Sequence, residues 1–527
     1  MSIVNAVGIP VALPDWVLAT GALLLLFYVY ATWTYDVFKK RKIPFLQPLP
    51  MVGNMKSTLF RSQSISEFVR DTYTKMKGHR ISGIYEFRNP LFFIRDPEIV
   101  KQVCVKDFDH FMNHRKAVSE KTDPFFSKSL FGLQDKRWRD MRSTLSPAFT
   151  SSKMKAMFLL ISECGRQTRE YLEERCREQP GGPDTVLTIE MKDFFTRFAT
   201  DVIATSAFGV KCDSLKQPKN EFYLMGKEIT TMTKIKSLVM MLYVIMPKLA
   251  EVLRISFFSK EASQFFSSLV HDTIATRERE KIVRPDMIHL MKEASKAGEI
   301  DSDKIKLDED DIAAQAILFF FAGFETVTTL ICFSTYLLAI HTDAQERLQR
   351  EIDSVLEEHN GELSYEALQK MKYLDMVVNE TLRMYPPVGA VDRACVRPLT
   401  IPATDTQPEI AFQKGDIIWI PIIGLHYDPA YFPEPEKFDP ERFSEERKDS
   451  IIPFTYMPFG LGPRMCLANR FALMEAKVAL VYLLSHFSLH VVDKTPIPMR
   501  YSTATFTNTS ATGFSIGVSL RNSEKSK

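Results

Sequence analysis

The sequence predicts a mainly α-helical protein with small β-sheets, preceded by an N-terminal transmembrane helix. Helical hydrophobic patterns dominate the chain, and strand-like segments are confined mainly to residues 80–95 and to the C-terminus beyond His486. An uncharged apolar segment lies close to the N-terminus. No low-complexity linker or 20- to 50-residue repeat divides the rest of the 527 residues, so we expect one large domain after the membrane segment.

The first element is a membrane anchor. No charged residue occurs from Trp16 to Tyr35, and at 1.5 Å per residue this segment spans about 30 Å, the thickness of a bilayer core. Four basic residues, 39–42, follow it, which predicts that the rest of the chain stays in the cytosol. A cleaved signal peptide is the alternative, but its apolar region would be shorter and its charges would come first. We assign residues 1–43 to the anchor and its basic stop, and residues 44–527 to the globular domain.

Composition excludes several classes of protein. The 67 Lys and Arg balance the 65 Asp and Glu to a net charge of +2, without the basic stripe of a nucleic-acid-binding protein. The 7 cysteines are odd in number and never form a CxxC pair, which argues against a disulfide framework and a zinc finger.

Directly after the anchor, Pro44, Pro48 and Pro50 predict a stiff turn that sets the body against the membrane.

The predicted axis of the body is a helix from Asp308 to about His341. Glu325 is the only charged residue from Ile312 to Thr342, so a second membrane span is an alternative. A length of about 46 Å is too great for a span, however, and we expect a buried axis. The polar residues around Glu325 then require a function, and Gly323 is expected to loosen the helix there.

A shorter apolar stretch, Ser237–Pro247 with Phe257 and Phe258 beyond it, is either a core helix or a membrane-dipping one.

One cysteine has distinctive neighbours. Residues 458–477 place two glycines and two prolines before Cys466 and good helix formers after it, which predicts a tight loop followed by a helix. A cysteine at a helix N-terminus is expected to have a lowered pKa, because the helix dipole and loop N–H groups stabilise the thiolate. A single thiolate held in this way suits axial ligation of haem iron.

The pattern Phe459-x-x-Gly462-x-Arg464-x-Cys466 resembles the haem-binding signature of the cytochrome P450 family. That family usually has glycine two residues after the cysteine, where this chain has Ala468. The resemblance extends over essentially the whole chain and implies the cytochrome P450 fold, a helix-rich body with small β-sheets. It also implies that residues 44–527 form a haem-thiolate monooxygenase domain.

Other motifs of the family occur in the same order. Glu380-Thr-Leu-Arg383 is similar to the ExxR motif, and Arg442 lies in the segment whose arginine joins that pair. The resemblance implies a buried structural network of Glu380, Arg383 and Arg442 with no direct role in chemistry.

The segment Ala322-Gly-Phe-Glu325-Thr326 resembles the oxygen-activation motif. It implies that Ala322 lies beside the haem, that Thr326 binds a water or the oxygen substrate, and that Glu325 belongs to a proton relay. The alternative is that the Thr326 hydroxyl only bonds back to its own helix.

Cations are needed for the two haem propionates. Trp138 and Arg142 are similar to the WxxxR pair that contacts a propionate, and by the same resemblance Arg393, Arg464 and either His114 or Arg115 supply further contacts.

The resemblance implies a monooxygenase of the endoplasmic reticulum membrane, with its catalytic domain on the cytosolic face. Electrons come from NADPH through a separate NADPH-cytochrome P450 reductase, assisted in some members by cytochrome b5. This chain has no GxGxxG after a strand with which to bind NADPH itself. Lys136, Arg137 and Arg139 are candidates for part of the docking surface, although each of them alone is more typical of ordinary solvated charge.

Family position also suggests the pocket that takes a lipophilic substrate. The candidate residues are Phe125, Phe126, Leu318, Phe321, Val388, Gly389 and Phe506. Their apolar character suggests lipophilic compounds such as plant toxins, insecticides, fatty acids or hormones. The chain resembles insect detoxification enzymes and the related vertebrate drug-metabolising group, which favours xenobiotics. The alternatives are a biosynthetic hydroxylase of an endogenous lipid or hormone, a haem-thiolate isomerase or dehydratase, and a non-catalytic haem protein.

Overall fold

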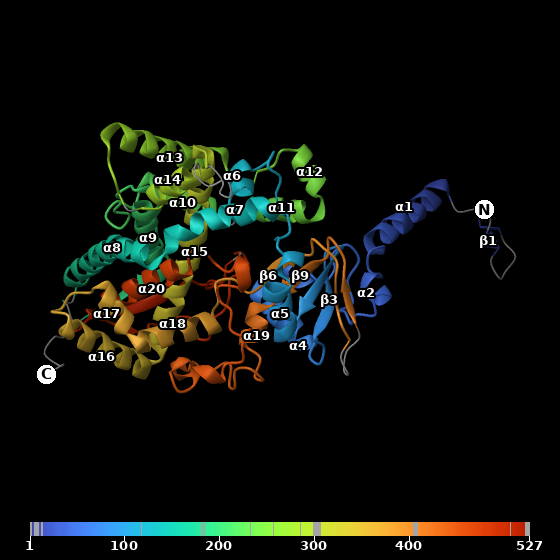
Figure 1. Cartoon of the computed structure of the whole chain (residues 1–527). Coiled ribbons are helices and arrows are strands. Elements are labelled where there is room, and N and C mark those ends of the chain that lie inside the picture. The colour runs from blue at the N-terminus through green and yellow to red at the C-terminus, as the bar shows by residue number, and fades with distance from the viewer. Residues whose placement is uncertain are drawn as a thin grey trace.

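The structure is a computed structural model of the full chain. It describes residues 14–116, 118–180, 182, 185–231, 233–256, 258–284, 286–298, 307–403, 409–505 and 507–521, with residues 3–4 and 10–11. A helix-rich body carries a smaller sheet region on one side, and the N-terminal helix α1 projects from that side (Figure 1). The predicted mainly α-helical class with small sheets is confirmed.

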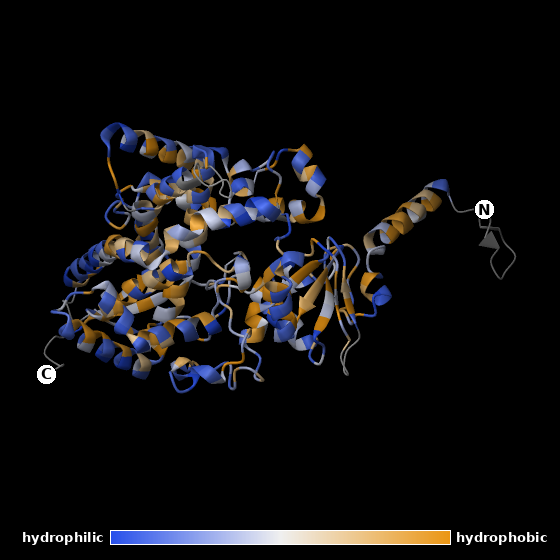
Figure 2. Ribbon diagram, in the orientation of Figure 1, coloured by the Kyte–Doolittle hydropathy of each residue, from blue (hydrophilic) through white to orange (hydrophobic). Residues whose placement is uncertain are grey.

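Helix α1, Asp15–Thr32, is apolar along its whole length and almost fully exposed, as expected for a membrane anchor (Figure 2). Its C-terminal end is attached to the body. The hydroxyl of Thr34 donates to the carbonyl of Arg88, and the Tyr35 hydroxyl donates to the carbonyls of Leu49 and Phe87. The short helix α2, Val37–Lys40, then buries Phe38 in the core. Residues from Thr34 onward therefore pack with the body, before the proline-rich turn begins.

The main sheet has the order β3-β4-β9-β6, formed by Ile81–Glu86, Asn89–Ile94, Ile417–Ile420 and Val391–Ala394. β3 and β4 are the strands predicted within residues 80–95, and they pair antiparallel; β4 pairs in parallel with β9, and β6 pairs antiparallel with β9. A second sheet joins β10 (Phe487–His490), β11 (Ser515–Leu520) and β5 (Leu187–Glu190). Two small pairs remain, β1 (Ile3–Val4) with β2 (Pro10–Val11) and β7 (Leu399–Ile401) with β8 (Ile410–Phe412).

The other α-helices are distributed between the helix-rich body around α15 and the sheet region. They are α3 (Lys56–Leu59), α4 (Ile65–Lys75), α5 (Pro97–Lys101), α6 (Pro124–Lys128), α7 (Asp135–Leu145), α8 (Ser151–Arg177), α9 (Met191–Ile203), α10 (Glu221–Thr230), α11 (Lys234–Ile245), α12 (Pro247–Val252), α13 (Lys260–Glu280), α14 (Met287–Gly298), α16 (Thr342–Glu358), α17 (Tyr365–Lys370), α18 (Lys372–Met384), α19 (Ile422–His426) and α20 (Asn469–Leu484).

Helix α15, Glu309–Ile340, is the predicted axis. A capping box between Asp308 and Asp311 starts it, and α9, α13, α18 and α20 pack around it. Most of its residues are buried inside the body, as expected for an axial helix rather than a second span. The expected loosening at Gly323 is wrong, because the helix continues unbroken past it. A Cβ at Gly323 would lie 3.1 Å from Ile203 Cδ1, so this glycine permits close packing against α9.

The second apolar stretch forms α11 and the start of α12, and much of its apolar surface is exposed. Leu238 and Met246 of this stretch are exposed, and so are the flanking Ile235 (74%), Val252 (77%) and Leu253. Phe258, in contrast, is only 4% exposed and packs inside the body, as the core alternative predicts. Phe257 lies outside the described residues.

Candidate functional site

The loop before Cys466 is closed by backbone hydrogen bonds. The N–H of Cys466 donates to the carbonyl of Phe459 over 2.9 Å, and Gly460 and Gly462 adopt positive φ angles of 75° and 69°. Gly462 is required for a second reason: a Cβ there would lie 1.9 Å from the carbonyl oxygen of Cys104. The predicted helix follows as α20, which begins at Asn469 and packs against α15. Ala468 has a φ of −93°, so this position does not need the conformational freedom of a glycine.

The protein environment of Cys466 does not lower the pKa of its thiol, so that expectation is wrong. Burial raises the pKa, while the backbone N–H of Ala468 and the Arg142 guanidinium lower it by less. The sulfur is surrounded by protein in most directions, yet the side chain still borders open space, and it is the only one of the 7 cysteines that is exposed. This accessible sulfur fits an iron ligand, and metal coordination favours the thiolate form.

On α15, the oxygen-activation segment also borders open space. Ala322 is exposed although the helix is central, and Thr326 is partly exposed. The Thr326 hydroxyl donates to the carbonyl of Ala322 over 2.6 Å, which is the back-bond considered as the alternative. Its oxygen retains lone pairs that can accept a hydrogen bond from a water.

Glu325 is held by two residues that the sequence analysis did not identify. Lys192 Nζ, at the start of α9, lies 2.7 Å from Glu325 Oε2, and the Thr507 hydroxyl donates to the same oxygen over 3.2 Å. Lys192 and Glu325 are 133 positions apart in the sequence, and no local pattern marks their pairing. The Glu325 carboxylate is therefore attached to α9 and to the C-terminal loop rather than to Thr326.

The predicted propionate contacts form a cluster with excess positive charge. Arg464 donates to the carbonyls of Met112, Leu130 and Leu133 and lies 4.1 Å from the ring centre of Trp138. Burial, and next the nearby Arg393, lower the pKa of Arg464 to about 9. Burial also lowers the pKa of Arg142. A buried anion would stabilise both guanidinium groups.

Two of these arginines have N–H donors without an acceptor among the described residues. Among the described residues no partner is found for the Arg142 guanidinium, and Arg393, only 1% exposed, has an Nε without a hydrogen bond. His114 Nδ1 shares a 3.0 Å hydrogen bond with Asp392, whereas the Arg115 guanidinium pairs with Glu86. One accessible sulfur, together with buried cations that lack anionic partners, fits haem, which needs an axial ligand and two propionate contacts.

Glu380, Arg383 and Arg442 meet in one buried network. The Glu380 carboxylate lies 2.7 Å from Arg383 Nε and 3.3 Å from Arg442 Nε, and it accepts the backbone N–H of Asp439 over 3.0 Å. The remaining guanidinium donors reach backbone carbonyls, among them those of His426, Pro435 and Glu434. The network connects α18 to the loop before the haem-binding segment and, in this structure, touches none of the predicted catalytic residues.

The predicted substrate residues are only partly brought together. The ring centres of Phe126 and Phe258 are 6.1 Å apart, and those of Phe258 and Phe321 are 5.7 Å apart, so Phe258 links two of them. Phe125, Leu318 and Val388 are partly buried. Gly389 is buried against α4, where a Cβ would lie 2.2 Å from Ser66 Oγ, and Phe506 lies outside the described residues.

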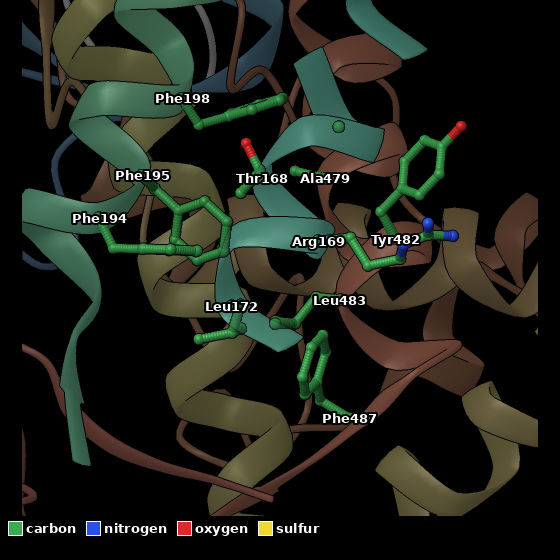
Figure 3. Close-up of a pocket in the computed structure, with 11 residues that line it drawn as sticks. Thr168, Arg169, Leu172, Phe194, Phe195, Phe198, Ala479, Tyr482, Leu483 and Phe487 are labelled. Carbon is green, nitrogen blue, oxygen red and sulfur yellow. The ribbon is translucent and has the colours of Figure 1, made fainter. Parts of the chain in front are cut away.

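A separate small pocket lies between α8, α9 and α20 (Figure 3). Its walls are mainly apolar, with Phe194, Phe195, Phe198 and Phe487 among them. None of the predicted site residues lines it, so we do not assign the catalytic function to this pocket.

Comparison with known proteins agrees with this arrangement. The family described as Cytochrome P450 matches residues 43–514. The chain is 49% identical to "Cytochrome P450 9e2" of Blattella germanica, covering 97% of this chain and 98% of that protein. It is 43% identical to "Probable cytochrome P450 9f2" of Drosophila melanogaster, covering 94% of this chain and 97% of that protein. With the cysteine loop, the central helix and the haem-compatible cations in place, the chain belongs to the cytochrome P450 family and is a haem-thiolate monooxygenase.

Proposed function

We propose that this enzyme is anchored in the endoplasmic reticulum membrane and oxidises lipophilic small molecules on the cytosolic side, xenobiotics foremost. The observation that supports lipophilic substrates is a series of contacting aromatic rings, Phe126, Phe258 and Phe321. Phe321 directly precedes Ala322 in the sequence. Haem bound through Cys466 supplies the oxygen activation, with electrons from NADPH through the reductase.

The residues of this chain bind the haem and position the groups that deliver protons. Arg142, Arg393, Arg464 and Trp138 hold the propionate side of the haem. Arg115 is paired with Glu86, so we assign the additional propionate contact to His114, whose Nε2 has no partner among the described residues. Because Nδ1 donates to Asp392, Nε2 can donate to a propionate only when the imidazole is protonated. Thr326 positions a water through its hydroxyl, and Glu325 accepts and returns protons at its carboxylate, which Lys192 and Thr507 keep in place.

A panel experiment tests this function. Membranes containing this chain and reductase are incubated with NADPH and a set of plant toxins, insecticides, fatty acids and hormones. Product formation that requires both NADPH and reductase is expected for lipophilic xenobiotics. Conversion without NADPH would indicate an isomerase or dehydratase, and exclusive turnover of one endogenous lipid or hormone would indicate a biosynthetic hydroxylase.

Thr326→Ala tests the proton-delivery role. We expect haem content to stay near normal while product per NADPH falls about ten-fold or more, because a positioned proton donor contributes at least about 100-fold to proton transfer. Hydrogen peroxide should account for the missing electrons. Thr326→Ser retains the hydroxyl and is the matched control. If both variants couple NADPH to product like the wild type, the hydroxyl only bonds back to Ala322.

We propose that lipid also contacts α11 and α12. The hairpin turn between β3 and β4 connects this surface to the anchor, since Arg88 stacks on Tyr30 of α1 while Asn89 donates to the carbonyl of Val244 in α11. In Figure 1, α12 and α1 lie on the same side of the body. Exposed Ile235, Leu238 and Val252 supply the apolar surface.

Deletion of residues 1–36 should leave a chain that binds haem but still associates with lipid vesicles. It also removes the Thr34 and Tyr35 hydrogen bonds, so we expect a lower unfolding temperature than for deletion of residues 2–29, which retains them. Vesicle flotation and thermal unfolding measure the two effects. Complete release of both truncated proteins from vesicles would contradict the second membrane contact.

We propose that the anchor ends at about Thr32 and that the haem domain begins at about Thr34 rather than at the predicted residue 44, because Thr34 and Tyr35 already hydrogen-bond to the body.

We propose the surface of α7 beside Trp138 for docking of reductase or cytochrome b5. Its basic side chains are exposed, although Lys136 pairs with Asp140, Arg137 with Glu120 and Arg139 with Asp109. These exposed pairs are weak and exchange readily with the acidic groups of a partner.

A further inference from the structure

His426 is a fully buried histidine between the Glu380 network and the cysteine loop, residues 457–466. It ends the short helix α19, which packs against α18 (Figure 1), and it is 0% exposed. Its Nδ1 lies 3.1 Å from the carbonyl oxygen of Arg383, and its Nε2 accepts the backbone N–H of Met457 over 3.0 Å. The imidazole therefore joins α18 to the start of the cysteine loop.

The two partners fix the position of the proton on this imidazole. A carbonyl oxygen can only accept, so Nδ1 carries a hydrogen, and a backbone N–H can only donate, so Nε2 carries none. Burial, and next the nearby Arg383 guanidinium, lower the pKa of His426 to about 3, in agreement with a neutral ring. A protonated ring would place two N–H donors face to face at Met457. His426 thus supplies one donor and one acceptor, each with its own partner.

The link to the Glu380 network is made in both directions. Arg383 Nη1 donates to the carbonyl of His426 over 2.9 Å, while the His426 ring donates to the carbonyl of Arg383. The Glu380 carboxylate binds the same guanidinium at Nε and Nη2. The Tyr456 ring stacks on the imidazole at 5.3 Å between centres, which restricts its rotation. Displacement of Arg383 would therefore displace His426 as well.

Met457 extends this link into the cysteine loop. Its carbonyl accepts the N–H of Gly460 over 3.0 Å, which closes a turn at the positive φ of Gly460. Phe459 lies within that turn, and its carbonyl accepts the N–H of Cys466 over 2.9 Å. The turn that begins at Met457 therefore presents the carbonyl that holds the backbone of Cys466.

We propose that His426 is a positioning residue for the Cys466 thiolate, because its Nε2 holds the Met457 turn and so couples the Glu380 network to the cysteine loop. Met457 is only 2% exposed, so without this acceptor its N–H would be buried and unpaired. The loop would then open more often to expose that N–H to water. Each opening also releases the backbone of Cys466, and thiolate ligation is lost more readily. This role does not depend on which substrate the enzyme oxidises.

Two substitutions separate the two hydrogen bonds of the ring. In His426→Gln the side-chain carbonyl can replace Nε2 as the acceptor for Met457, whereas in His426→Asn the shorter amide can replace only the Nδ1 donor to Arg383. Each variant loses one buried hydrogen bond, so both should unfold at a lower temperature than the wild type.

The measurement that distinguishes these variants is the lifetime of the thiolate-type absorption band. The haem-loaded full chain in lipid nanodiscs is reduced, treated with CO and held at one temperature below unfolding. His426→Asn should lose the band about ten-fold faster than His426→Gln. This ratio corresponds to about 1.4 kcal/mol, within the cost of an unpaired buried N–H.

Tyr427→Phe is the matched control. It removes the hydrogen bond from the Tyr427 hydroxyl to the carbonyl of Met384, which also joins the end of α19 to α18 but does not reach the cysteine loop. Its unfolding temperature should fall while the band lifetime stays near that of the wild type. If His426→Asn keeps the band as long as Tyr427→Phe does, or if His426→Gln loses it as fast as His426→Asn, the positioning role is overturned.

Hydrogen exchange in the wild-type protein tests the same coupling even if His426→Asn takes up no haem. The haem-loaded protein is labelled with deuterium, and the amides of Met457 and Cys466 are resolved by fragmentation in a mass spectrometer. If one opening of the loop exposes both amides, their protection should agree to within about ten-fold. A Met457 amide that exchanges faster than Cys466 by more than this factor would show that the loop stays closed without the His426 bond, and would overturn the proposal.

Discussion

Cys466→Ser should abolish thiolate ligation and with it turnover. A serine hydroxyl is a poor donor to iron, and the other 6 cysteines are buried elsewhere in the body. The serine fits the space, because the N–H of residue 466 still donates to the Phe459 carbonyl and Gly462 still fits against Cys104. The loss is therefore one of ligation rather than of folding. The measurement is the absorption spectrum of the reduced, CO-treated protein, in which the thiolate-type band should disappear.

Cys395→Ser is the matched control for this variant. Cys395 is buried, and its sulfur donates to the carbonyl of Arg397 over 2.9 Å, a bond that a serine hydroxyl can replace. The thiolate-type band and turnover should both survive. If Cys466→Ser keeps the band, a different residue ligates the iron and the cysteine loop is not the haem site.

Elements set by local pattern were predictable from the sequence. The strand-like segments within residues 80–95 predicted β3 and β4, and the nearly uncharged segment after Asp308 predicted α15. The loop at Cys466 was predictable because prolines fix φ while glycines permit the positive φ angles of a tight turn. The short strands β6 and β9 were not predicted, since 4 residues each carry too little periodicity to distinguish a strand from a loop.

Features that depend on distant residues were not predictable. Nothing near Glu325 indicates that Lys192 will pair with it, and nothing near His114 indicates Asp392. The direction of the Cys466 pKa shift was wrong because the helix-terminus argument omits burial, which is the larger cause. Phe258 follows an exposed apolar stretch but turns inward, and hydropathy cannot distinguish a residue that faces lipid from one that faces the core.

Glu380→Gln should damage folding and haem retention rather than chemistry. The wild-type carboxylate accepts hydrogen bonds from Arg383, Arg442 and the Asp439 backbone N–H. Glutamine keeps one acceptor oxygen, replaces the other with an N–H donor facing a guanidinium, and removes the negative charge. Two cations then share a buried site without their counterion.

Breaking such a buried set by removing one partner costs about 3 to 5 kcal/mol, a large part of the roughly 5 to 15 kcal/mol that stabilises a domain. We therefore expect low haem content per protein and a clearly lower unfolding temperature. Glu475→Gln is a matched control, because Glu475 is equally buried and burial raises its pKa well above the usual range, which favours the uncharged carboxyl. This change should have a much smaller effect. A Glu380→Gln protein with normal haem content and unfolding temperature but no turnover would make Glu380 catalytic, since loss of activity would then occur without loss of structure.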